Sequence, residues 1–193
     1  VFEEGLLIPI SKFAERGKIN NFLLKILRAN VRTPDQTVGD IFSLAACNDA
    51  GNFRLQAMMQ EFKLNDIEEL SHFIIETSHK TTKFAISKVL DGRYKNTMCV
   101  DGYDIPVHME VTIDVEGTTL AADFHGTSGM SAFGVNVPEV YTRAYACYAL
   151  KCAIAPDVPN NSGSLNSFDI NVPKGSILAA TRPVPVSVRH VLG

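Results

Sequence analysis

The chain has 193 residues, of which 46% are hydrophobic, and a formal net charge of -3. This length and composition allow a sizeable core in one large domain or two small ones, which excludes a disordered protein. The acidic balance offers no basic surface for nucleic acid, and no apolar run is long enough to cross a bilayer, so neither nucleic-acid nor membrane partners are expected. The opening residues, Val1 to Gly5, lack the basic character of a secretory signal, which predicts a cytoplasmic protein.

Residues 1–92 are predicted to be mainly helical, because apolar residues recur at intervals of three and four. Asn20 is positioned to cap a first helix, and Thr33-Pro34 is typical of the start of a second. The polar segment 48–52 is expected to interrupt this second helix.

A further amphipathic run follows Asp66 and ends at Leu90-Asp91-Gly92. We therefore predict a helical hairpin in the first half of the chain.

Residues 93–193 are predicted to be a mixed antiparallel β region with one helix. From Val107 to Glu116, apolar and polar residues alternate, which indicates a half-buried strand. Glu116-Gly117 is interpreted as a two-residue hairpin turn. This turn predicts three apolar pairs across the hairpin: Ile113 with Leu120, Val111 with Ala122, and Met109 with Phe124.

The remaining elements complete an α+β fold class. Residues 138–155 are expected to form the embedded helix, and residues 167–186 short strands broken by prolines. The expected architecture is thus an N-terminal helical hairpin followed by an antiparallel, strand-rich region.

The predicted hairpin also brings polar residues together on its other face. It places two imidazoles and two carboxylates side by side, a combination that suits several divalent metal ions. These four residues are His108, Glu110, Asp123 and His125. An ordinary solvent-exposed face is the favoured interpretation, and a self-contained metal hydrolase is the alternative.

The loop Gly126-Thr127-Ser128-Gly129-Met130 differs from two catalytic motifs that it resembles in part. Met130 stands where a nucleophile elbow requires a second glycine, and the loop has no lysine for a phosphate-binding P-loop. Its backbone N-H groups either face a ligand or form a turn. The segment 160–164 is interpreted as a structured turn, since asparagine, serine and glycine favour that geometry.

Several motifs, in order, resemble the hydantoinase B and oxoprolinase family. They run from Glu4-Gly5 to Arg189-His190 and so span nearly the whole chain. The most extensive are Asp123-Phe124-His125-Gly126-Thr127-Ser128, Gly134-Val135-Asn136, Tyr141-Thr142-Arg143-Ala144, the run 156–164 and Val172-Pro173-Lys174-Gly175-Ser176. Family members usually carry glutamine where this chain has Met130.

The resemblance implies a fragment of the B-type subunit of an ATP-dependent cyclic amidohydrolase that opens hydantoin, 5-oxoproline or lactam rings. A partner A-type subunit would bind ATP and phosphorylate the substrate within a hetero-oligomer. The family's divalent-metal ligands lie upstream of the motif at Glu4-Gly5, so the fragment is expected to bind no cofactor and to be inactive in isolation. A subunit of an ATP-dependent ketone carboxylase and a non-catalytic assembly domain are the alternatives.

The catalytic residues are not assigned, but the resemblance indicates a candidate wall for the substrate pocket. These candidates are Asp123, Thr127, Ser128, Asn136, Arg189 and His190. None of them is assigned as a general base.

Overall fold

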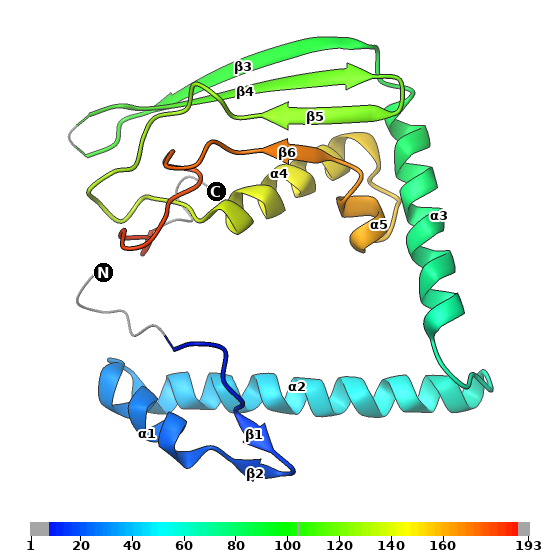
Figure 1. The fold of residues 1–193 in the computed structure, drawn as a ribbon, viewed down its shortest axis with the longest axis vertical. Helices are drawn as coiled ribbons and strands as arrows, with labels where there is room; N and C mark the ends of the chain where they lie inside the picture. The colour runs from blue at the N-terminus through cyan, green and yellow to red at the C-terminus, as the bar shows by residue number, and fades with distance from the viewer. Residues whose placement is uncertain (1–7, 104, 189–193) are drawn as a thin grey trace. The chain divides into compact units, whose positions relative to one another are not determined.

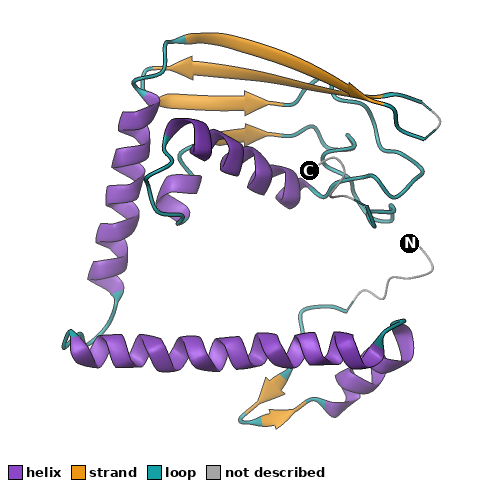
Figure 2. Ribbon diagram, turned by 180° about the vertical axis from the view of Figure 1, so that it is seen from behind, coloured by secondary structure: helices purple, strands orange, loops and turns teal. Residues whose placement is uncertain are grey.

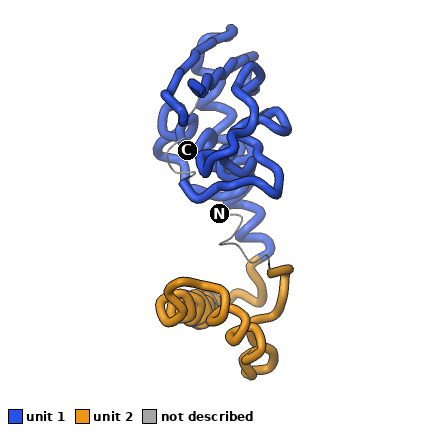
Figure 3. Tube along the Cα trace, turned by 90° about the vertical axis from the view of Figure 1, so that its left-hand side faces the viewer, with its two compact units in different colours: residues 1–2, 68–193 blue, residues 3–67 orange. Residues whose placement is uncertain are grey.

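The computed structural model describes residues 8–103 and 105–188. The chain divides into two compact units, one of residues 3–67 and the other mainly of residues 68–193 (Figure 3). Within the described residues, no helix combines the length and the apolar character needed to span a membrane.

The first unit, as far as the structure describes it, contains a short hairpin and two helices. Its elements are β1 (Ala14–Glu15), β2 (Lys18–Ile19), α1 (Asn21–Asn30) and α2 (Pro34–Glu61). The Asn20 side chain accepts a hydrogen bond from the Leu23 N-H at 3.1 Å, which confirms the predicted cap. Thr33 precedes α2 as expected but makes no side-chain cap bond.

The expected interruption of α2 at residues 48–52 was wrong, because the helix continues through them. These residues are exposed, so their polar side chains remain in water without a burial cost. A single glycine inside an exposed helix costs about 1 kcal/mol, which is too little to end a long helix.

In its described residues, the second unit contains a four-stranded sheet and three helices (Figures 1 and 2). The sheet order is β3 (Gly92–Val100), β4 (Val107–Glu116), β5 (Thr119–Asp123) and β6 (Asp169–Asn171). The helices are α3 (Glu68–Ile86), α4 (Glu139–Ile154) and α5 (Ser162–Leu165). Helix and sheet together confirm the α+β class.

The sheet is mixed rather than antiparallel throughout. β6 runs parallel to β5, because the chain passes through α4 and α5 before it returns to the sheet. The several short strands expected between residues 167 and 186 reduce to β6, followed by turns. Prolines in this segment remove the backbone N-H groups that a longer ladder needs.

The predicted hairpin register was wrong by two residues. Leu120 lies opposite Val115 instead of Ile113, since the turn consists of Gly117 and Thr118. Gly117 adopts a φ of 56°, a left-handed conformation that favours glycine in tight turns. A displacement of two keeps every side chain on its predicted face, so the alternation alone could not distinguish the two registers.

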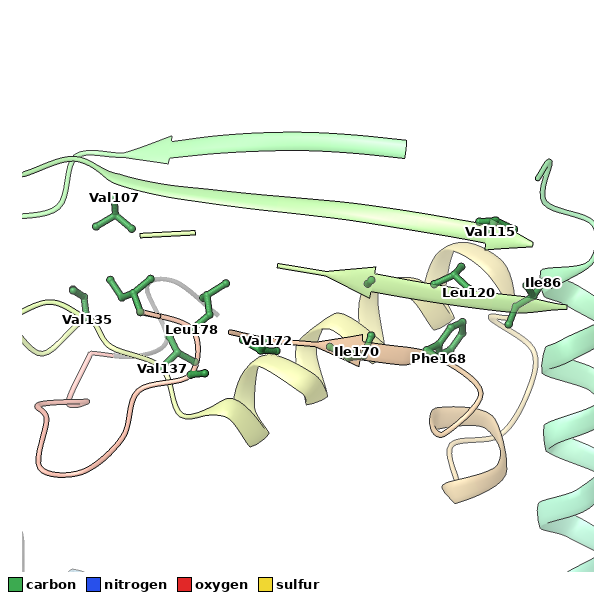
Figure 4. Close-up of a cluster of buried hydrophobic side chains, with 13 residues drawn as sticks. Ile86, Val107, Val115, Leu120, Val135, Val137, Phe168, Ile170, Val172 and Leu178 are labelled. Atoms are coloured by element: carbon green, nitrogen blue, oxygen red, sulfur yellow. The ribbon is translucent and has the colours of Figure 1, made fainter. Parts of the chain in front are cut away.

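The core of the second unit lies between the sheet and α4 (Figure 4). Apolar residues of β4, β5, β6 and the segment after β6 meet there, with Ile86 from the end of α3. The buried members are Ile86, Val107, Val115, Leu120, Ala122, Val135, Val137, Phe168, Ile170, Val172, Ile177, Leu178 and Ala179.

The segment 160–164 contains the start of α5 and attaches this helix to α3. Asn161 caps α5 and donates a hydrogen bond to the Ser78 hydroxyl at 2.8 Å. A Cβ on Gly163 would lie 2.0 Å from the Ile75 carbonyl oxygen, so only glycine allows the two helices to come this close. This contact places α3 in the same compact unit as the sheet. The change from helical to strand periodicity at residue 92 therefore does not mark the boundary between the two units.

Candidate functional site

The loop between β5 and α4, residues 124–138, carries most of the predicted site residues. It is held to the first half of β4 by two hydroxyl side chains. The Thr127 hydroxyl accepts from the Glu110 N-H at 3.1 Å and contacts the Glu110 carbonyl oxygen at 3.2 Å. The Ser128 hydroxyl accepts from the His108 N-H at 2.9 Å, and the Ser128 N-H donates to the His108 carbonyl at 2.8 Å. β5 pairs with β4 only from Thr112 onward, so these bonds satisfy β4 backbone groups that β5 does not reach.

Asn136 organises the interior of this loop. Its side chain is fully buried. The amide oxygen accepts from the Ser131 N-H at 2.8 Å, and the amide nitrogen contacts the carbonyl oxygens of Ser131, Phe133 and Pro185 at 2.8 to 2.9 Å. Asn136 therefore shapes the loop and joins it to the segment after β6, and has no exposed surface to offer a ligand.

A pocket of about 360 Å³ lies beside the loop and is called the loop pocket here. Its walls are Ser128, Gly129, Met130, Ser131, Ala132, Phe133, Tyr103, Ile105, Pro106, Val107 and Ile177. The Tyr103 and Phe133 rings stack with centroids 4.6 Å apart. Mainly apolar walls with a few hydroxyl groups are typical of small-molecule sites.

Asp123 lies at the end of β5 and holds the ring of His125. One carboxylate oxygen lies 3.0 Å from the His125 Nδ1, and it also accepts from the Asn171 side chain at 3.1 Å. The hydrogen bond from the His125 ring lowers the pKa of the Asp123 carboxyl, with the bonds from the His125 N-H and Asn171 contributing in the same direction. Asp123 thus stays ionised and fixes the orientation of this imidazole.

The observed strand register does not bring together the alternative metal site predicted from His108, Glu110, Asp123 and His125. Thr112 lies opposite Asp123, and the Glu110 carboxylate instead pairs with the Lys95 ammonium at 2.6 Å. Across the described ranges 8–103 and 105–188, no three histidine, cysteine or carboxylate side chains gather closely enough to hold a metal ion. The described residues therefore do not fit the divalent metal that the family resemblance implies.

The predicted site residues consequently separate into different roles. Ser128 lines the loop pocket, while Thr127 and Asn136 hold the loop that forms its wall. Asp123 pairs with His125 and is not among the residues that line the loop pocket. Arg189 and His190 lie outside the described residues.

Sequence reasoning missed the aromatic part of the loop pocket. Tyr103 and Phe133 are far apart in the chain, and no local motif marks either residue. Their stacking depends on the β3–β4 connection meeting the β5–α4 loop, which is a tertiary contact.

The fold of the chain is shared with two enzymes that depend on ATP. An ATP-dependent caprolactamase from Pseudomonas jessenii matches it with a TM-score of 0.81 over 94% of this chain and 32% of that one, at 17% identity. An acetone carboxylase in its nucleotide-free structure matches with a TM-score of 0.79 over 97% of this chain and 27% of that one, also at 17% identity. At these identities the likeness defines the fold alone.

The family model for hydantoinase B/oxoprolinase matches residues 1–193, and the chain belongs to this family. A relative from a Pseudomonas species, named as the B-type subunit of a D-/L-hydantoinase, is 29% identical over 206 residues, which cover all of this chain and 35% of the relative. The chain thus spans about a third of the length of this curated relative.

Proposed function

We propose that these residues form part of the B-type subunit of an ATP-dependent cyclic amidohydrolase that opens a hydantoin, 5-oxoproline or lactam ring. The observation that carries the proposal is the match of the hydantoinase B/oxoprolinase family along the entire chain. In this proposal ATP is held by a partner A-type subunit, and the divalent metal by parts of the same B-type polypeptide that lie outside these residues. The complete enzyme is then a hetero-oligomer, and we place it in the cytoplasm.

The loop pocket is proposed as one wall of the substrate site. Its apolar residues suit the carbon atoms of a small ring, and the Ser128 and Ser131 side chains lie among them. A hydroxyl group both donates and accepts hydrogen bonds, so it suits a cyclic amide, which presents an N-H and a carbonyl. Asp123, Arg189 and His190 remain candidates for other walls of the substrate site.

We also propose that the isolated chain is inactive. Hydrolysis of an amide needs an activated water, which a metal supplies by lowering the pKa of that water toward about 7. No group of three candidate ligands is present in the described ranges to hold such an ion.

The test is to mix the chain with an A-type subunit and ATP, and to repeat the assay with these residues within a full-length B-type subunit. Ring opening of hydantoin, 5-oxoproline or caprolactam only with the full-length subunit, and only with ATP, is expected. Ring opening by the chain and partner alone would contradict the metal assignment. No ring opening in either assay would refute the hydrolase proposal.

The fold shared with acetone carboxylase favours a ketone carboxylase as the second candidate. The same two assays, run with acetone, ATP and bicarbonate, distinguish the reactions. Consumption of ketone with no ring opening would replace the hydrolase with a carboxylase.

A non-catalytic assembly domain is the third candidate, and the exposed apolar side chains of both units favour it. Examples are Phe53 on α2, 74% exposed, and Phe73 on α3, 65% exposed. Substitution of residues lining the loop pocket separates a docking role from a catalytic one, because a purely docking domain would keep full activity in the assembled enzyme.

A further inference from the structure

The loop pocket has carbon-rich walls with no charged side chain among the described residues that line it. These walls come mainly from the β5–α4 loop and the β3–β4 connection, with Ile177 from the segment after β6. Tyr103, Ile105, Met130 and Phe133 are between 38% and 73% exposed and supply most of the accessible apolar surface. The pocket therefore offers contact to the carbon atoms of a ligand and no ion to pair with a charge.

Two serine hydroxyls contribute neutral hydrogen-bond donors to the loop pocket. The Ser128 hydroxyl accepts from the His108 N-H at 2.9 Å, and the Ser131 hydroxyl accepts from the Phe133 N-H at 3.1 Å. A hydroxyl oxygen that accepts a hydrogen bond keeps its own hydrogen, so each group can still donate one. Such donors suit the carbonyl oxygen that every cyclic amide carries.

A carboxylate next to the ring fits these walls poorly. Transfer of a charge from water to an apolar site is costly unless a cation or several hydrogen bonds replace the lost water. No described side chain of the wall carries an N-H group or a positive charge. The pocket thus has partners for a ring carbonyl and none that balances a negative charge.

We propose that the loop pocket selects cyclic amides that carry no charge next to the ring, and disfavours a ring with a carboxylate, such as 5-oxoproline. This inference rests on the proposed function and narrows its three candidate rings to lactams and hydantoins. Met130 and Ile105 then act as specificity-determining residues, because they present apolar atoms where a carboxylate needs a cation.

The test compares 5-oxoproline with 5-oxoprolinamide, which share the ring and the size of the side group and differ in charge. Both are given to the full-length B-type subunit with its A-type partner and ATP, and kcat/KM for ring opening is measured. The native enzyme should prefer the amide by about tenfold or more, because the carboxylate loses its hydration without gaining a partner. For a compound that binds without ring opening, an inhibition constant against caprolactam replaces kcat/KM.

Two variants add a positive charge to the pocket wall. Met130→Lys should reduce the preference for the amide about tenfold, because the new ammonium group pairs with the carboxylate. Ile105→Lys introduces the same charge from the β3–β4 connection and should act in the same direction. It provides a second measurement if Met130→Lys does not fold.

Two controls separate charge in the pocket from other effects of substitution. Met130→Gln is nearly unchanged in size and uncharged, so it should keep the native preference. Met98→Lys is the matched lysine control, because Met98 is 56% exposed on β3 and does not line the loop pocket. It should leave the preference at the native value.

A native enzyme that uses 5-oxoproline as well as its amide overturns this inference and leaves the hydrolase proposal intact. An unchanged preference in both pocket lysine variants also overturns it, because the side group would then lie away from the loop pocket. Equal loss of the preference in Met98→Lys has the same meaning. If hydantoin, caprolactam, 5-oxoproline and its amide all stay closed, the proposed function itself fails.

Discussion

Several side chains of the β5–α4 loop hold the backbone of this loop in place beside the loop pocket. Thr127 and Asn136 stand within motifs that resemble those of the family, and both direct their hydrogen bonds to backbone groups. Ser128 combines a backbone contact with a place on the pocket wall. Loss of such a residue would reduce activity by displacing the wall, without removing a group that reacts.

Asn136→Ala is expected to destabilise the second unit by about 2–4 kcal/mol, because it leaves several buried backbone groups without partners. Urea unfolding followed by circular dichroism measures the loss. Asn166→Ala, at an exposed asparagine of the same unit, is the control and should change the free energy of unfolding by less than about 0.5 kcal/mol. Equal effects of the two substitutions would contradict the role of Asn136.

Asp123 gives the second unit a pH dependence on the acid side. Its folded-state pKa is lowered, chiefly by the hydrogen bond from the His125 ring, so the unfolded state binds the proton more readily. The stability it contributes is therefore present above the usual aspartate pKa and is lost as pH falls through the lower, folded value.

Asp123→Asn should consequently flatten the dependence of unfolding free energy on pH in that acid range. Unfolding measured at a series of pH values checks this outcome. Asp169→Asn, at an exposed carboxyl of β6, is the comparison variant. An unaltered acid slope in Asp123→Asn would show that the pair with His125 contributes nothing to folding.

At the scale of elements, the contact between α3 and α5 depends on one close approach. The Gly163 backbone lies against the Ile75 carbonyl, and Ser167 and His79 are joined at 2.9 Å beside it. These contacts fix a helix of the first half of the chain to the segment that leads into β6.

Gly163→Ala is expected to destabilise this contact by about 1–3 kcal/mol, since a methyl group has no space between the two backbones. A lower midpoint in thermal or urea unfolding would report the loss. Gly129→Ala adds a methyl group where no atom lies within 4 Å, so it should leave the midpoint almost unchanged. The assignment of the close approach fails if both variants unfold alike.

Patterns within one element were predicted well. The alternation at residues 107–116 predicted β4 with its bounds, the periodicity at 138–155 predicted α4 to within a residue at each end, and Asn20 caps α1 as expected. Each of these features depends on neighbours along the chain, which the sequence presents directly. The turn at Gly117 was misplaced because both possible turns keep the same faces of the hairpin.

At the scale of the whole molecule, large apolar side chains are exposed among the described residues. They occur in both units, and include Phe22, Phe53, Phe62, Phe73, Phe84, Tyr148 and Val140. Apolar surface of this kind is typical of sites that contact other proteins or other parts of a larger polypeptide. This agrees with a chain that spans about a third of a curated relative.

In the assembled enzyme, Phe133→Ala should raise KM about tenfold, which corresponds to roughly 1.4 kcal/mol of lost contact with the substrate. The reason is that Phe133 and Tyr103 form the aromatic wall of the loop pocket. Phe84→Ala, at an exposed phenylalanine of α3, is the matched control for the general effect of removing a ring. An unchanged KM in Phe133→Ala would remove the loop pocket from the substrate site.

The sequence by itself determined the α+β class, the main helices, the faces of the β4–β5 hairpin and, through its ordered motifs, the family. These follow from local periodicity, capping and spacing. Only the tertiary structure decided that the described residues His108, Glu110, Asp123 and His125 do not form a metal-binding group, that Asn136 is buried, and that Tyr103 meets Phe133. The physical reason is that strand register and loop contacts depend on packing between distant segments, where several arrangements satisfy the same local pattern.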